Sequence, residues 1–138
     1  MGYDLMPIRS EAGSPSGMIM TWPMILQETG AGYLLGYGIN TVKAGYYVYD
    51  GRRGPGSPVS NDGFKVSASE AKTMAKLFRG YVFVQRAIRK DYEAMSSHDK
   101  EIYSKFNCMH KEPPCEEFIN KVEELAEFCE KSNGFRID

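Results

Sequence analysis

The clearest hydrophobic pattern in the chain begins at residue 71 and has helical spacing. Apolar positions recur every three or four residues, at Ala71, Met74, Ala75, Phe78, Tyr81, Val82, Ile88, Tyr92 and Met95. Ser67 and Glu70 precede this run at the spacing of a capping box, in which each side chain bonds the other residue's backbone N–H. The pattern predicts one long amphipathic helix from about residue 68. Gly80 costs this helix roughly 1 kcal/mol relative to alanine and is expected to mark close packing.

A second helical pattern lies near the C-terminal end. One face carries Phe118, Val122, Leu125, Ala126 and Cys129. Pro113-Pro114 predicts the start of this helix, and Asn133-Gly134 predicts its end in a left-handed cap. We expect Phe135 to fold back onto the last turn and residues 135–137 to form an edge strand beside the N-terminus. Residues 96–106 either continue the long helix or form a short helix capped by Ser96 or Ser97.

The first 66 residues have the pattern of strands and turns. Residues 3–8 are predicted to form a strand. Pro7 either weakens the end of this strand or places it on a sheet edge, because proline donates no backbone hydrogen bond. Thr21 can cap a short helix that tolerates Pro23 in its first turn. Aromatic and β-branched residues bounded by glycines over 32–51 predict two or three more strands.

Composition supports this division. Twelve of the 14 glycines lie between Gly2 and Gly63, whereas the rest of the chain has a helical composition. The expected fold class is therefore α+β, with a small antiparallel sheet from residues 1–66 packed against a long central helix and a C-terminal helix. A length of 138 residues fits a single domain over 1–138, with a β part (1–66) and a helical part (67–138).

Charge and cysteine content narrow the classes of partner. The net charge is −1, so the chain as a whole has no electrostatic attraction to nucleic acid or acidic membranes. No segment has the length and apolar character of a membrane span, and the N-terminus lacks the pattern of a signal peptide. Three cysteines give no disulfide framework. We expect a cytoplasmic protein without a nucleic-acid or membrane partner.

The two main helices have opposite charge. Residues 67–95 hold six basic and three acidic side chains, whereas residues 112–130 hold seven acidic side chains and one lysine. One interpretation is that the helices are antiparallel neighbours whose exposed pairs each contribute about 0–1 kcal/mol. The alternative is that the basic face receives an anionic ligand or partner.

Catalytic and metal-binding patterns are weak. Cys108, His110 and Cys115 are close in sequence, but their spacing is not that of a zinc site, and Cys129 falls on the core face of a helix. The glycines of residues 30–38 lack the strand-before, helix-after context of a dinucleotide-binding motif. We predict no metal, no cofactor and no catalytic residue, which favours a protein that is not an enzyme.

The segment from Gly51 to Gly63 is the best candidate for a ligand site. Two guanidinium groups suit phosphate or carboxylate, and the backbone amides at the start of the following helix attract anions. Aromatic side chains upstream could stack on a base. The predicted ligand residues are Trp22, Tyr46, Arg52, Arg53, Asn61 and Asp62. The alternative is a plain exposed turn with its corner at residues 61–63.

Four short stretches carry a resemblance. They are MGYDL at the start, TWPMI, SNDGFKVSASEAKTMAKLF, and EEFINKVEELAEFCEKSNGFRI at the end. Together they resemble a loose group of small uncharacterised phage, prophage and bacterial proteins that begin Met-Gly-x-Asp, carry Asn-Asp-Gly before a central helix and end in a Phe-Cys helix and Gly-Phe. The present chain has Asn133-Gly134 where the group has Gly-Gly. The resemblance implies that the chain is a phage or prophage accessory protein, located in the host cytoplasm.

Three functions follow, in order of preference. The first is a non-enzymatic protein that sequesters a small nucleotide-type ligand and so antagonises host defence. The second is a phage or prophage protein that inhibits a host protein by direct contact, for which the expected feature would be an exposed apolar or acidic patch. The third is a small enzyme acting on a phosphorylated substrate. In each case a homo-oligomer is compatible with the sequence.

Overall fold

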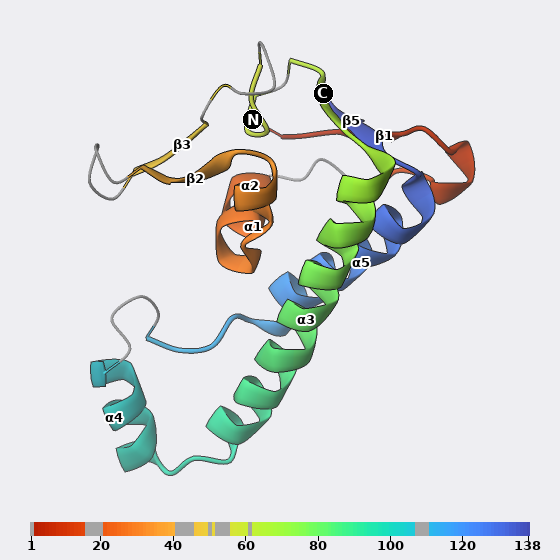
Figure 1. Ribbon diagram of the computed structural model, residues 1–138. Coiled ribbons are helices and arrows are strands. Elements are labelled where there is room, and N and C mark those ends of the chain that lie inside the picture. The colour runs from red at the N-terminus through yellow and green to blue at the C-terminus, as the bar shows by residue number, and fades with distance from the viewer. Residues whose placement is uncertain are drawn as a thin grey trace.

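The computed structural model describes residues 2–15, 21–40, 46–49, 51, 56–60, 62–106 and 111–138. Its elements in chain order are β1 (Leu5–Pro7), the 3-10 helix η1 (Ser10–Ala12), α1 (Trp22–Thr29), α2 (Ala31–Leu34), β2 (Tyr37–Asn40), β3 (Tyr46–Tyr49), β4 (Phe64–Val66), α3 (Ala68–Glu93), α4 (Ser97–Phe106), α5 (Glu116–Ser132) and β5 (Phe135–Ile137). A small antiparallel sheet lies at one end of the long α3 helix, and α5 runs alongside α3 (Figure 1). The expected α+β class is confirmed.

The three-stranded sheet joins the two ends of the chain. Its order is β1-β5-β4, with both pairs antiparallel, so that Ile137 lies opposite Leu5 on one side and Phe64 on the other. Pro7 sits on an edge strand, as predicted. Residues 135–137 form the predicted strand beside the N-terminal strand β1. They do not form an edge strand, because β4, which the sequence pattern did not reveal, covers the other side of β5.

Residues 31–40 contain both a helix and a strand. α1 ends at Gly30, whose φ of 78° is left-handed, and α2 follows at once. Ala31 and Leu35 are both fully buried, and their spacing of four residues buries the same face of a helical turn. Strands were expected over 32–51. The described residues of this range contain two, β2 and β3, which form a separate two-stranded sheet.

α3 begins with the predicted capping box. The Ser67 hydroxyl accepts from the Glu70 backbone N–H at 3.2 Å, and the Glu70 carboxylate accepts from the Ser67 N–H at 3.0 Å. The helix buries the face carrying Ala71, Met74, Ala75, Phe78 and Val82. Close packing at Gly80 is not found in the described part of the chain, because a Cβ built there would meet no heavy atom within 4 Å.

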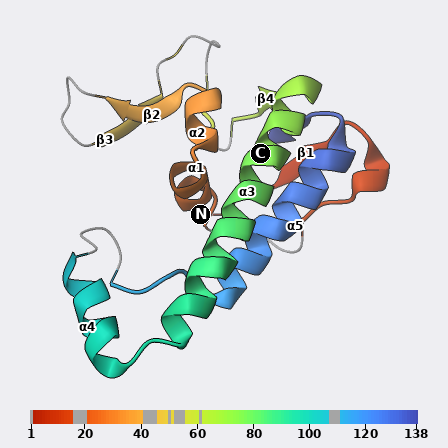
Figure 2. The same cartoon turned by 60° about the horizontal axis from the view of Figure 1, so that its bottom comes forward.

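α5 packs antiparallel to α3 and supplies the other half of the helical core (Figure 2). Its first residue is Glu116 and its N-cap is Cys115, so it begins after the Pro113-Pro114 pair rather than at it. The helix ends as predicted: Asn133 has a left-handed φ of 56° and Gly134 a φ of 100°. Phe135 then turns back onto α5, where its ring lies 5.3 Å from that of Phe128.

α4 is a separate short helix, which decides between the two alternatives for residues 96–106. The Ser96 hydroxyl caps it by accepting from the Asp99 backbone N–H at 3.1 Å. None of its residues is buried. Its aromatic contact with α3 is made by Tyr103, whose ring centroid lies 5.3 Å from that of Tyr92. α4 thus stands at the far end of α3 from the sheet (Figures 1 and 2).

The core lies where α1, α3, α5 and the three-stranded sheet meet. Its largest fully buried side chains include Trp22, Phe78 and Phe135. Burying an aromatic or large aliphatic side chain contributes about 1.5–3 kcal/mol, so this cluster supplies much of the stability of the fold. Among the described residues, no helix combines the length and apolar character needed to cross a bilayer.

Candidate functional site

The predicted ligand loop is only partly described. Arg52, Arg53 and Asn61 lie outside the described residues, and Tyr46 is described only as part of the β3 backbone. Asp62 is exposed. A ligand-binding role for the two arginines therefore stays a prediction, and only the described residues on either side of them can be assessed.

Trp22 is a core residue and does not offer a face for stacking. Its side chain is fully buried, its ring packs edge-on against Phe135 at 6.3 Å, and its indole Nε1 donates to the carbonyl oxygen of Pro58 at 2.8 Å. The predicted role of Trp22 needs correction for this reason: a ligand could stack on the ring only by displacing core side chains. The prediction that Trp22 lies beside this segment is correct, but its indole holds the Pro58 backbone and does not face a ligand.

Residues 56–60 are fixed to the core by a second aromatic donor. The Tyr3 hydroxyl donates to the carbonyl oxygen of Val59 at 2.8 Å. Within the segment, Ser57 and Ser60 bond each other, with the Ser60 hydroxyl donating to the Ser57 carbonyl at 3.0 Å. Two carbonyl groups of this segment are thus held by aromatic side chains, which satisfies buried acceptors that would otherwise be costly.

The start of α3 already holds a negative charge of its own. The Glu70 carboxylate accepts from the Ser67 N–H, and the Ser67 hydroxyl occupies the Glu70 N–H. Gly134 also lies close, since a Cβ built on it would come within 3.1 Å of the Ala68 nitrogen. The helix end that we expected to attract a phosphate is therefore capped by side chains of the chain itself.

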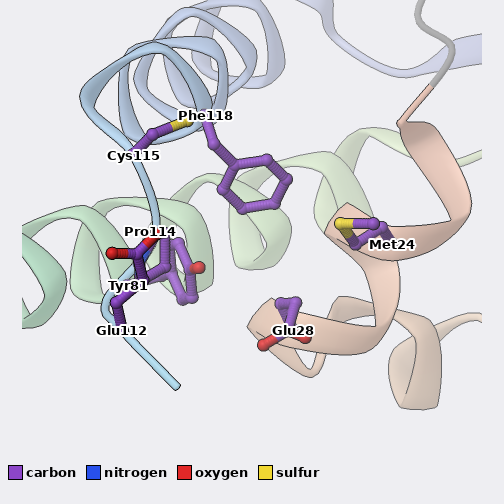
Figure 3. Close-up of a pocket in the computed structure, with 7 residues that line it drawn as sticks. All are labelled: Met24, Glu28, Tyr81, Glu112, Pro114, Cys115 and Phe118. Atoms are coloured by element: carbon purple, nitrogen blue, oxygen red, sulfur yellow. The ribbon is translucent and has the colours of Figure 1, made fainter. Parts of the chain in front are cut away.

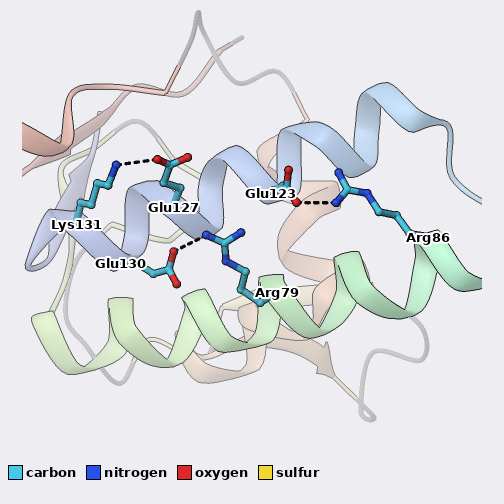
Figure 4. Close-up of polar contacts among 6 residues, drawn as sticks. All are labelled: Arg79, Arg86, Glu123, Glu127, Glu130 and Lys131. Carbon is cyan, nitrogen blue, oxygen red and sulfur yellow. Dashed lines mark hydrogen bonds and ion pairs between the residues drawn. The ribbon is translucent and has the colours of Figure 1, made fainter.

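Among the described residues, Arg79 and Arg86 of α3 form ion pairs with carboxylates of α5. Arg79 contacts Glu130 at 2.6 Å and Arg86 contacts Glu123 at 2.7 Å (Figure 4). The hydrogen bond from Arg86, followed by its charge, holds the pKa of Glu123 below its usual value. This confirms the interpretation of the opposite charges as an attraction between antiparallel neighbours. All four side chains are 40–46% exposed, so the pairs lie at the surface and each adds little to stability.

The basic side chains of α3 form a surface that these ion pairs use only in part. Lys72, Lys76, Arg79, Phe83, Arg86 and Lys90 are spaced alternately by four and three residues, which places them in one line along a helix. We call this line the basic row. Within the described part of the chain, Lys72, Lys76 and Lys90 make no ion pair, and all three are exposed.

Phe83, at the centre of the basic row, is 78% exposed. Its neighbour Val84 is 48% exposed. Beside the N-terminal part of the row, a hollow of about 440 Å³ is lined by Lys72, Ala75, Lys76, Arg79 and Glu130. The row therefore combines an unburied aromatic ring, basic side chains and an adjacent depression. The basic face of this helix was predicted from its charges, and the alternation of four and three is readable in the sequence. Phe83 is not among the apolar positions that face the core, so its place in the row was missed.

Other chemistry is sparse in the described residues. No group of three or more His, Cys, Asp or Glu side chains there could hold a metal ion, and Cys108 and His110 lie outside them. Cys115 is exposed and Cys129 is buried, and both are free thiols.

Comparisons with protein-family models, with curated proteins and with solved structures found no match.

Proposed function

We propose that the protein is a non-enzymatic binding protein that docks an acidic protein partner onto the basic row of α3. The observation that carries this proposal is Phe83, 78% exposed in the middle of five basic side chains. Aromatic and arginine side chains are the residues that most often dominate the energy of a protein interface. Binding would cover an apolar ring that the described part of the chain leaves in solvent.

The charges around Phe83 indicate the chemistry of the partner. Lys72, Lys76 and Lys90 would attract carboxylates and steer association, while Phe83 would enter an apolar recess. A nucleic-acid backbone is less suitable, because its evenly spaced phosphates would meet the carboxylates of Glu123 and Glu130 beside the row. A protein can place its own charges to avoid them.

This proposal takes up the second of the three functions set out above. In its more specific form, the proposal is that the partner is a host protein and that the chain has a phage or prophage origin. That form rests on the sequence resemblance. A nucleotide held by Arg52 and Arg53 stays a prediction, although Trp22 is buried and the start of α3 is capped.

Site-specific photocrosslinking would test the proposal. Benzoylphenylalanine would be placed at position 83 and, as a matched control, at position 33, because Tyr33 is also exposed (55%) but lies on α2. We expect a discrete crosslinked protein from position 83 alone. Equal crosslinking from both positions would contradict a docking site on α3.

The partner would then be purified and its affinity measured by calorimetry. Phe83→Ala should weaken binding by about 2 kcal/mol or more, roughly 30-fold. Lys76→Glu with Lys90→Glu should weaken it most at low salt, because exposed charges are screened as salt rises. Lys105→Glu with Lys111→Glu, at two exposed lysines away from the row, is the charge-matched control. Unchanged affinity of the Phe83→Ala variant would refute the proposal.

A further inference from the structure

A cavity separate from the basic row lies between α1, α3 and the segment that enters α5. It has a volume of about 220 Å³ and is lined by Met24, Glu28, Tyr81, Glu112, Pro114, Cys115 and Phe118 (Figure 3). Tyr81 is two residues from Phe83 on α3 and so lies about 200° around the helix axis from it. The cavity and the basic row are therefore independent surfaces of the same helix.

The hydroxyl of Tyr81 is the unusual group in this cavity. It is buried from solvent and, in the described structure, has no hydrogen-bond partner. Its ring packs edge-on against Phe118 at 6.2 Å, and Figure 3 shows the hydroxyl directed toward the space bordered by Phe118 and Glu28. Burial, and then the charge of Glu28, raise the pKa of Tyr81, so this phenol stays neutral. A buried hydroxyl without a partner is rare enough to require an explanation.

The rest of the lining determines what could satisfy that hydroxyl. Phe118, Pro114 and Met24 offer apolar and aromatic surface, whereas Glu28 and Glu112 bring two carboxylates to the same cavity. Carboxylates disfavour an anion and favour a cation, and aromatic rings attract cations at their faces. A neutral phenol oxygen can accept a hydrogen bond from an N–H donor.

We propose that this cavity binds a small organic cation, a guanidinium, amidinium or ammonium group on an apolar stem. The stem lies on Phe118 and Met24, the charged group lies near the carboxylates of Glu28 and Glu112, and one N–H donates to the Tyr81 hydroxyl. The volume suits a group the size of one side chain and is below that of common cofactor pockets. The cation comes either from a free small molecule or from an arginine or lysine of a polypeptide.

The test uses benzamidinium and its neutral isostere benzamide as probes of the whole chain. Methyl-labelled methionine gives an NMR signal from the Met24 side chain in the cavity wall, assigned with Met24→Leu. We expect benzamidinium to shift this signal saturably and benzamide to leave it unchanged. Equal shifts with both probes, or saturation with neither, would overturn the proposal.

Variants distinguish the contribution of the Tyr81 hydroxyl to binding from that of the shape of the cavity. Tyr81→Phe keeps the ring and should weaken benzamidinium binding about tenfold. Glu112→Gln should weaken it less, because its carboxylate is exposed. Tyr103→Phe, on α4, is the matched control and should bind as the wild type does. Affinity that Tyr81→Phe leaves unchanged would also overturn the proposal.

The source of the cation is decided by two further probes. Agmatine represents a free guanidinium compound, and a short capped peptide with one central arginine represents a polypeptide. Tighter binding of agmatine supports a free ligand, and tighter binding of the peptide supports a side chain of a partner. Lys76→Glu in the basic row should change neither, so failure at one surface does not imply failure at the other.

Discussion

The indole Nε1 of Trp22 donates to the carbonyl oxygen of Pro58 at 2.8 Å, across 36 residues of sequence. Both residues are buried, so the bond ties the first turn of α1 to the segment that precedes β4. Tyr3 adds a parallel bond to Val59. Two aromatic donors thus hold residues 58 and 59, within the segment that the sequence marks as a ligand site.

Trp22→Phe is expected to destabilise the protein by about 2–4 kcal/mol. The change leaves the Pro58 carbonyl without a partner in the core and opens a cavity beside Phe135. Tyr3→Phe, which removes a partly buried bond, is the milder comparison at about 1 kcal/mol. Urea unfolding followed by circular dichroism measures both, and equal losses for the two variants would contradict the central role of Trp22.

Gly134 is predicted to be intolerant of any side chain. Its φ is 100° and an added Cβ would lie 2.8 Å from the Val66 carbonyl oxygen. Gly134→Ala should therefore lower the free energy of unfolding by about 2 kcal/mol or more, from backbone strain and steric overlap together. Gly13→Ala is the matched control, because Gly13 has a φ of 65° but open space around it. A loss at Gly134 no larger than the loss at Gly13 would show that the overlap relaxes freely.

Local signals explain which parts of the fold were predictable. Ser67 and Glu70 form their capping box within four residues, and Asn133 ends α5 through its own backbone conformation. Such features depend on neighbours in sequence. β4 was missed because its three residues form a strand only by pairing with β5, about seventy positions later in the sequence, where Phe64 lies opposite Ile137.

The candidate sites were less predictable for a related reason. Whether an aromatic ring contacts a ligand or the core depends on packing that no local pattern encodes. The sequence therefore predicted that Trp22 lies near the loop, but not that its side chain is buried in the core. The same holds for Tyr81, which the helical spacing assigned to the core face. The unpartnered state of its hydroxyl results from what α1 and the start of α5 place around it. The basic row, by contrast, follows from spacing alone.

Acid should destabilise the protein partly through its surface carboxylates. Hydrogen bonds from Arg86 and Lys131 lower the pKa values of Glu123 and Glu127, respectively. Folded-state values below the unfolded ones mean that this stabilisation is complete above the ordinary carboxyl range, about pH 4.3, and is lost as pH falls through the lowered values. Urea titrations from neutral pH to about pH 3 should therefore show a falling free energy of unfolding.

Glu123→Gln should reduce this acid-dependent loss, because the amide cannot be protonated in that range. Glu101→Gln is the control, since Glu101 is exposed on α4 and makes no ion pair within the described residues. The same acid dependence in both variants would show that the pair between Arg86 and Glu123 is not formed in solution.

The two described thiols should differ sharply in reactivity, and the difference reports directly on the packing of α5. Cys115 is exposed at the N-cap, whereas Cys129 is 1% exposed on the face that meets the core. Burial raises the pKa of Cys129, and the thiolate is the reactive form of cysteine.

In a Cys108→Ser background, an aromatic disulfide reagent should modify Cys115 promptly and leave Cys129 intact even at about pH 9. Cys129 should react only as the protein unfolds, so that its rate rises with urea in step with the loss of helical circular dichroism. Cys115→Ser in the same background isolates the Cys129 signal. Prompt modification of Cys129 in native buffer would mean that α5 opens far more readily than its packing against α3 allows.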